Sequence, residues 1–409
     1  MSPLTSYRHL LDLAGPAYVA VAFLGRLPLS MSQLGTLLLV STATDSYGTG
    51  GLAAGALAVS NAAGSPIAGA VADRVGQRPV VLVQSLAGAV AMVALVLLTL
   101  GGQPGPVLVA ASVVTGFVLP QVGPLARVRW RPMTESAGQH QRRLMNAAFS
   151  YEGAADEASF VIGPALVGVV AVIASPAGAM ITAASLLAVF GSGFALHESA
   201  RLTGGASRAV SKARLVTGVF VTLLAAQLLI GVLFGATQTG TTALAEKAGE
   251  PGLAGLIHAL LGVGSVIAGL ATVILPERIG HERRVLGSAV ALVAFSWPLL
   301  LVDSLTGLVA VVLLLGFGVA PYMIGVFSLG ERAVPQSRVG TAMTLLAGAT
   351  GIGYAVGSSV AGRLVDVDGY TAAFGVTVAA TILGLLLAAI GQRAWQRTAS
   401  APEPVAAVA

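Results

Sequence analysis

The sequence predicts an all-α polytopic membrane protein with twelve transmembrane helices arranged as two six-helix halves. Hydrophobic residues make up 56% of the 409 residues and charged residues only 10%, which is far below the roughly 25% charged residues of a soluble domain. Apolar runs of about 20 residues, each long enough to cross a ~30 Å hydrocarbon core, recur along the chain. The runs are continuous and do not alternate with polar residues, which favours helices over barrel strands.

Twelve apolar spans follow one another with short polar connections. The first span carries Arg26 near its middle and continues beyond the length of a signal peptide, so we expect it to be retained. The 52 glycines suit membrane helices that approach one another closely. The expected spans, with approximate edges, are 14–41, 49–72, 79–101, 106–128, 146–173, 177–196, 215–242, 252–275, 285–302, 305–329, 339–365 and 371–391.

The distribution of basic residues supports this number of spans. All but three of the 22 lysines and arginines lie on one side, the exceptions being Arg26, Lys247 and Arg363. The positive-inside rule then places both termini in the cytoplasm and the chain in the cell membrane as a multi-pass protein. The net charge of +5 is therefore explained by topology, with no need for nucleic acid, and the lack of cysteine excludes disulfides, thiolate metal sites and thiol catalysis.

A weak internal repeat indicates two halves. Similar residues recur at nearly equal offsets, namely Gly76 and Gly280, Gly116-Phe117 and Gly316-Phe317, Arg143 and Arg338, and Gly153 and Gly348. Such a repeat is typical of transporters built from two six-helix bundles. We therefore expect an N-terminal bundle over 1–197, a cytoplasmic linker over 198–214, a C-terminal bundle over 215–391 and a disordered cytoplasmic tail over 392–409.

A short charged loop joins the second and third spans. Its ordered pattern is a glycine, an Asp-Arg pair, a second glycine and a basic residue, here Gly69, Asp73, Arg74, Gly76 and Arg78. This pattern resembles the signature loop of the major facilitator superfamily of secondary transporters. Together with the twelve spans and the repeat, the resemblance covers most of the chain. It implies the major facilitator fold and transport by alternating access.

The resemblance also implies roles for the loop residues. Asp73 is expected against the cytoplasmic end of helix 11, where a carboxylate at a helix N-terminus gains a few tenths to about 1 kcal/mol. Gly69 is expected to permit close helix approach and Gly76 a tight turn. A solvated interfacial hairpin is the alternative interpretation. Because Val273 and Glu277 replace Gly69 and Asp73 in the second half, we expect Asp73 to matter more than Glu277.

The fifth span carries a second motif. Gly163, Pro164 and Gly168 resemble the antiporter motif of exporters in this superfamily, although Val167 replaces one of its paired glycines. The motif favours export, and a packing kink found in transporters of either direction is the alternative. Family exporters also carry an arginine on helix 4 shortly before a glycine, a feature that the sequence lacks before Gly116. A drug–proton antiport mechanism therefore cannot be transferred directly.

Three acids on the fifth span are the main chemical signal. Asp156 lies ~15 Å along this span, at a depth similar to that of Arg26, and an arginine at that depth needs a partner. Glu152 and Asp156 share one helix face, whereas Glu157 is rotated away from them. Clustered acids cannot all ionise in a low-dielectric interior, so one of them is a candidate for proton coupling. A buried structural salt bridge between Arg26 and one acid is the alternative.

We expect the protein to export a small organic molecule by proton coupling, with Arg26, Glu152, Asp156 and Glu157 as the substrate- and proton-binding residues. The expected partners are the lipid bilayer, the substrate and protons; no cofactor, metal or nucleic acid is expected, and the chain is expected to be a monomer. Proton-coupled uptake of a sugar or small organic anion, with Arg26 binding the anion, is one alternative. A non-transporting membrane sensor on the same fold is another. The five histidines are scattered and form no acid–histidine cluster, which argues against an enzyme.

Overall fold

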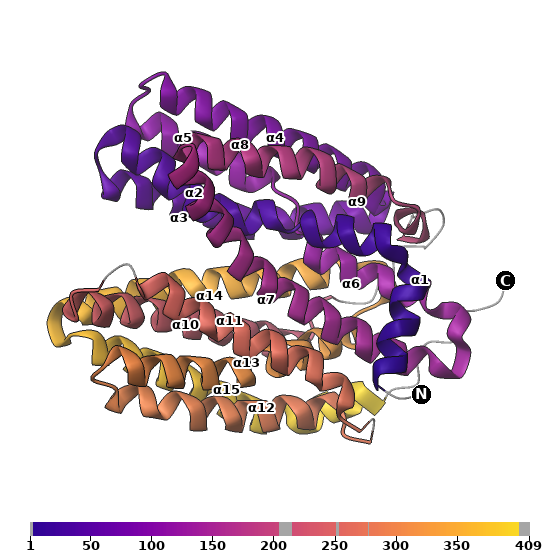
Figure 1. The fold of residues 1–409 in the computed structure, drawn as a ribbon. Helices are drawn as coiled ribbons and strands as arrows, with labels where there is room; N and C mark the ends of the chain where they lie inside the picture. Colours follow the sequence, from indigo (N-terminus) through magenta and orange to yellow (C-terminus); the bar gives the residue numbers. More distant parts are fainter. Residues whose placement is uncertain (1–2, 204–214, 251–252, 277, 401–409) are drawn as a thin grey trace.

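The computed structural model of the chain describes residues 3–203, 215–250, 253–276 and 278–400. These residues form long helices and short helical turns, and none of them is in a strand. The helices before the 204–214 gap lie in one group and those after it in another, and α1 begins at the same end of the bundle at which α15 ends (Figure 1). The fold is the all-α membrane architecture that the sequence predicts.

The first group contains nine α-helices and three shorter helical segments. The bounds are α1 Pro3–Leu24, α2 Leu27–Thr44, α3 Tyr47–Val75, α4 Gln77–Leu100, α5 Gly105–Val118, α6 Val122–Met133, η1 Glu135–His140, α7 Gln141–Ile173, α8 Pro176–Leu186, the π-helical η2 Leu187–Gly191, α9 Ser192–Leu196 and η3 Glu198–Thr203.

In the described part of the second group, six α-helices and three short 3-10 segments have defined bounds. The bounds are α10 Gly218–Lys247, α11 Ala254–Ala271, η5 Thr272–Ile274, α12 His281–Ser296, η6 Trp297–Leu301, α13 Leu305–Ala333, η7 Gln336–Arg338, α14 Val339–Asp368 and α15 Tyr370–Ser400. Side-chain oxygens cap the N-termini of α3, α8, α10 and α13, a role played by Ser46, Ser175, Thr217 and Ser304. These caps satisfy backbone N–H groups that a helix start leaves without partners.

Each of the twelve predicted spans corresponds to one helix or one consecutive set of helical segments. Among the described residues, eleven helical stretches are long and apolar enough to cross a membrane. They include residues 5–44 as one stretch and exclude α3, whose 29 residues are rich in glycine, alanine and serine. α3 packs between α2, α5 and α14, so its small side chains serve close helix contact at the expense of hydropathy.

Two spans that the sequence predicts as continuous are interrupted. The first is broken at Gly25-Arg26 between α1 and α2, and α1 is itself kinked at Gly15, whose φ is +74°. The fourth is broken at residues 119–121 between α5 and α6. Asn61 of α3 donates to the carbonyl oxygens of Gly116 and Leu119, at 3.0 and 2.9 Å. These hydrogen bonds satisfy carbonyl oxygens at the point where the helix is interrupted and no water is available within the membrane.

The C-terminal boundary predicted from sequence is wrong in part. α15 continues to Ser400, so residues 392–400 of the expected disordered tail are helical, whereas residues 401–409 lie outside the described chain. The reason is a tertiary contact, since Trp395 is buried and its indole N–H donates to the Thr222 hydroxyl of α10 at 2.9 Å. Residues 204–214, most of the expected linker, also lie outside the description, and residues 198–203 form η3.

Candidate functional site at the meeting of the two halves

The signature loop contacts the second half directly. Asp73 of α3 accepts hydrogen bonds from the backbone N–H groups of Gly340 and Thr341, at 2.9 and 2.8 Å, and from the Thr341 hydroxyl at 2.6 Å. These residues form the first turn of α14, the helix that corresponds to the eleventh span. The carboxylate therefore caps a helix N-terminus, in agreement with the position that the family resemblance implied.

The other residues of the loop support this contact. A Cβ atom on Gly69 would lie 2.9 Å from the carbonyl oxygen of Gly340, so α3 and α14 approach more closely than a side chain would allow. Gly76 ends α3 with a φ of +90°, a conformation that favours glycine. Arg74 is exposed in the last turn of α3, and Arg78 is half-buried in the first turn of α4.

Further contacts between the halves lie at the same end of the bundle, which we call the arginine-rich end because it holds Arg74, Arg78, Arg131, Arg142 and Arg338. Arg131 of α6 forms a salt bridge with Glu331 of α13, with 2.5 Å between Nε and Oε1. The hydroxyls of Ser150 on α7 and Thr272 on η5 lie 2.6 Å apart. The Tyr7 hydroxyl of α1 donates to the carbonyl oxygen of Leu270 at 2.8 Å.

The interface between α3 and α14 loosens toward the opposite end. A Cβ on Gly348 would lie 3.1 Å from the carbonyl oxygen of Ala62, and one on Gly351 would lie 3.9 Å from the Ala62 side chain. Gly55, two turns further along α3, has no neighbour within 4 Å of such an atom. The halves are therefore packed together from the arginine-rich end to about the middle of this helix pair.

The α7–α11 interface is closed over a longer stretch. A Cβ on Gly269 would lie 3.5 Å from the Ala154 nitrogen, near the arginine-rich end, and one on Gly262, in the middle of α11, would collide with the Val161 side chain of α7. Gly168 of α7 and Gly255 of α11, both toward the opposite end, have no neighbour within 4 Å of an added Cβ. Both helix pairs are thus closed at the arginine-rich end and loose at the other.

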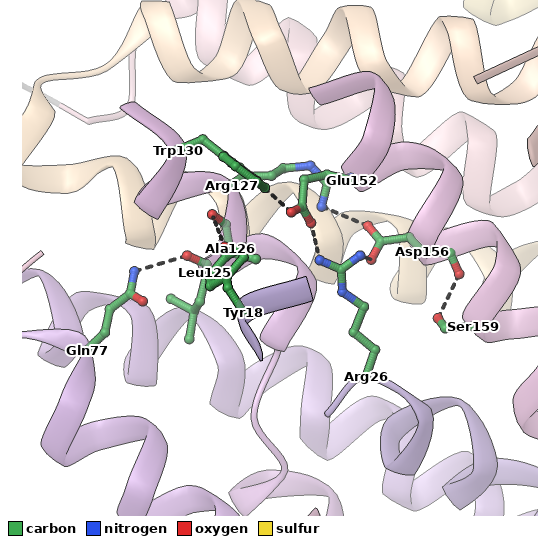
Figure 2. A network of polar contacts seen from close by, with 10 residues as sticks. All are labelled: Tyr18, Arg26, Gln77, Leu125, Ala126, Arg127, Trp130, Glu152, Asp156 and Ser159. Carbon is green, nitrogen blue, oxygen red and sulfur yellow. Dashed lines mark hydrogen bonds and ion pairs between the residues drawn. The ribbon is translucent and has the colours of Figure 1, made fainter. Parts of the chain in front are cut away.

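A buried network of four charged side chains lies at this middle level (Figure 2). Arg26 extends from the α1–α2 break toward α7, where it forms salt bridges with Glu152 and with Asp156, the latter at 3.4 Å. Asp156 also pairs with Arg127 of α6, with 2.7 Å between Oδ2 and Nη1. Two arginines are therefore balanced by two acids in the protein interior.

Glu152 has the surroundings of a structural residue. Its side chain has no exposed surface, and its second oxygen accepts a 2.6 Å hydrogen bond from the Trp130 indole. Trp130 is itself buried and packs edge-on against Tyr18 of α1, with ring centroids 5.2 Å apart. Glu152 thus joins α1, α6 and α7 within the first half.

Asp156 differs from Glu152 in being accessible. Its side chain is 22% exposed although both arginines that contact it are almost fully buried. Gly123 of α6 lies directly against its carboxylate, where a Cβ atom would collide with Oδ1. The acid therefore occupies space that only a glycine leaves free.

Glu157 lies between the acidic network and the second half. Its side chain is buried near Ser265 of α11, whose hydroxyl has no hydrogen-bond partner in the described chain, and its carboxylate also feels the charge of Arg127. It forms no salt bridge with any residue that the structure describes. The three acids predicted from sequence therefore lie close along α7 but have three different environments.

The antiporter-like motif is part of one uninterrupted helix, α7. Gly163 packs against Ser30 of α2, where an added Cβ would clash with the serine. Pro164 lies within the same helix, and Gly168 faces open space beyond it. The glycines thus have different surroundings, one at a tight contact and one on the loose side of the interface.

Sequence reasoning missed the part played by α6. Arg127 and Arg129 are among the basic residues that the sequence places on one side of the membrane, but both are buried. Arg129 donates from Nε to Gln77 at 2.9 Å and from Nη1 to the Phe194 carbonyl oxygen at 2.7 Å, and it stacks on the Phe194 ring. The available signal was Pro120-Gln121, which ends one helix and lets a second carry the arginines into the bundle.

Comparison with known proteins agrees with this architecture. The Major Facilitator Superfamily sequence model matches residues 218–407. An uncharacterized MFS-type transporter, y4rN, from Sinorhizobium fredii is 26% identical over 324 residues, covering 74% of this chain and 76% of its own length.

Two solved structures share the fold. The human organic anion transporter MFSD10 (TETRAN) superposes with a TM-score of 0.74 at 20% identity, covering 91% of this chain and all of its own. A bacterial homologue of the iron transporter ferroportin, in an outward-facing state, gives a TM-score of 0.70 at 16% identity, covering 91% and 99%. The family model matches the second half, and the related transporter and the two solved structures extend the agreement to most of the chain, so the comparisons support a major facilitator superfamily transporter and not an enzyme.

Proposed function

We propose that this transporter exports a small organic molecule in exchange for protons, with Asp156 and Glu157 as the candidate proton-binding residues and Arg26 as their charge partner. The observation that carries the proposal is the exposure of Asp156 within an otherwise buried network of charges. A partly accessible carboxylate held by two arginines can exchange a proton, whereas a fully buried ion pair is more suited to a structural role. Gly163, Pro164 and Gly168 support export as the direction.

The distribution of contacts between the halves supports alternating access. If the arginine-rich end faces the cytoplasm, as the positive-inside rule predicts, the structure is closed on that side. Asp73 then stabilises the outward-open state through its cap on α14 and releases it when the halves rock. In this arrangement the bundles over 1–197 and 215–391 move about the charged network, with the linker and both termini in the cytoplasm.

Glu157 is the second candidate for the proton. A buried carboxyl without a cationic partner is tolerated in its neutral form, because an isolated buried charge is costly. The Ser265 hydroxyl belongs to the other half, so the environment of Glu157 changes when α7 and α11 separate. Inward movement of one proton is worth about 2.3 kcal/mol per 100 mV of membrane potential, which can drive export against a gradient.

Transport in proteoliposomes tests the proposal. Compounds that raise the melting temperature of the purified protein are loaded into the vesicles, and their movement is followed under an imposed pH gradient. The Asp156→Asn, Glu157→Gln double variant is expected to lose gradient-driven transport while remaining folded and monodisperse. Gradient-driven transport at the wild-type rate by that variant would remove both acids from the mechanism.

Proton-coupled uptake of an organic anion is the second candidate. Two observations favour this function: two buried arginines lie in the charged network, and MFSD10, a protein with the same fold, is described as an organic anion transporter. Reversing the pH gradient separates the two mechanisms: efflux of a compound loaded into the vesicles is driven by an acidic exterior if it is exchanged for protons, and by an acidic interior if it moves together with them. Comparing an organic anion with its uncharged ester in the same assay then reports whether an arginine binds the substrate.

A further inference from the structure

Arg127 touches both the acidic network and the opposite half of the molecule. Its side chain is 2% exposed, and its Nη1 lies 2.7 Å from Asp156 of α7. Its guanidinium carbon stands 4.3 Å above the centre of the Phe327 ring, which belongs to α13. One side chain thus joins the candidate proton site to the surface that must separate when the arginine-rich end opens.

The two arginines of the network depend on Asp156 to different degrees. Arg26 pairs with Glu152 as well as Asp156, so it keeps a counter-ion when Asp156 becomes neutral. For Arg127, Asp156 is the one acid within salt-bridge distance in the described chain, and its Nε has no hydrogen-bond partner there. Neutralising Asp156 therefore removes the one salt bridge of Arg127 in the described chain and leaves a buried cation with only the weaker charge interaction of Glu157, which is destabilising.

The position of Arg127 makes this cost act on the interface. One helical turn further, Arg131 bridges to Glu331, also on α13. Arg127 faces Phe327, and Arg131 faces Glu331. The two residues of each contact are as far apart in the sequence as Gly116 and Gly316, which are equivalent in the internal repeat. α6 and α13 therefore meet at equivalent positions of the repeat, on the axis that relates the two halves.

We propose that Arg127 is the residue that couples the charge of Asp156 to opening of the arginine-rich end, an inference that rests on the proposed function of Asp156. With Asp156 ionised, Arg127 is neutralised and can stay packed on Phe327. With Asp156 neutral, Arg127 is stabilised by hydration, which requires α6 to move away from α13. The charged or titratable groups around Asp156, besides Arg127, are Arg26, Tyr151, Glu152 and Glu157, and Glu331 beyond them is already bound to Arg131.

Distances between two spin labels test this coupling without measuring transport. The chain has no cysteine, so Leu196→Cys and Ile274→Cys give a labelled pair with no background. Both positions are exposed at the arginine-rich end, at the end of α9 in the first half and on η5 in the second. In lipid nanodiscs, Asp156→Asn is expected to raise the ratio of long to short label distances at least tenfold over the unsubstituted pair.

Two further variants distinguish coupling from general loosening. Asp156→Asn combined with Arg127→Met, which removes the cation and keeps an apolar side chain over Phe327, is expected to restore the short distance. Glu152→Gln is the matched control, because it removes one of the two acids that pair with Arg26, an acid with no hydrogen bond or ion pair to the second half in the described chain, and is expected to leave the distances unchanged. Unchanged distances in Asp156→Asn, or long distances that persist in the double variant, would overturn the inference. If Asp156→Asn lengthens the label distances but the Asp156→Asn, Glu157→Gln double variant keeps gradient-driven transport, only the proton-coupled function is contradicted.

Discussion

Replacing Asp73 by asparagine tests the capping contact between the halves. The carboxylate accepts three hydrogen bonds from Gly340 and Thr341, whereas an asparagine offers one acceptor oxygen and turns an amide donor toward backbone N–H groups. Hydrogen bonds to charged groups contribute about 1.5–3 kcal/mol net, and a charge near a helix N-terminus about 0.3–1 kcal/mol. We take the loss as about 2 kcal/mol, which lowers the closed-to-open ratio about 30-fold at 1.36 kcal/mol per factor of ten.

The label pair at Leu196 and Ile274 measures this ratio, and transport by the unlabelled variant is expected to fall because the outward-open state loses population. Ser175→Ala is the matched control, since it removes an N-cap of similar geometry, 3.0 Å from the Gly178 N–H, that lies within the first half. Glu277 lies outside the described residues, and Glu277→Gln is expected to have little effect. An unchanged label distance in Asp73→Asn, or equal transport losses in the Asp73 and Glu277 variants, would refute the reasoning.

Three more predictions follow from the network and the interface. Gly123→Ala is expected to displace the Asp156 carboxylate that it touches, lowering transport in proteoliposomes with little change in melting temperature; wild-type transport would contradict this. Glu152→Gln is expected to cost about 1.5–3 kcal/mol of stability, the net contribution of a hydrogen bond to a charged group, because Arg26 keeps Asp156; this is seen as a lower melting temperature. Arg131→Glu alone and Glu331→Arg alone are each expected to lengthen the label distance, whereas the double variant that exchanges the two residues is expected to keep it short. A double variant with the same long distance as the single variants would contradict a direct pair.

Some of this site could be predicted because the physical constraint is strong. An arginine in the middle of an apolar span needs a counter-ion, which pointed from Arg26 to the acids of the fifth span. The spacing of Glu152 and Asp156 on one helix face placed both within its reach. Asp73 and Gly69 could be placed because their pattern resembles a known loop. In each case a single residue has few acceptable environments within a membrane.

The role of Arg127 could not be predicted, and the reason is the scale of the signal. Hydropathy is averaged over about 20 residues, so a break of three residues between α5 and α6 does not register. An arginine near the end of a span is equally compatible with a side chain that reaches the membrane surface. The burial of Trp395 likewise depends on a contact with α10. A contact with a distant segment cannot be deduced from the composition of the tail.

The two interrupted helices indicate why one part of the network is structural and another is suited to function. Arg26 lies at the α1–α2 break, and its pairing with Glu152 is fully enclosed within the first half. Such a pair orients the broken helix and has no contact that changes when the halves move. Asp156 lies against Arg127 on the helix that follows the α5–α6 break, and Arg127 extends to α13. A salt bridge that held only the first half together would not require an arginine stacked on the second, so the structural interpretation accounts for Glu152 and leaves Asp156 and Arg127 unexplained.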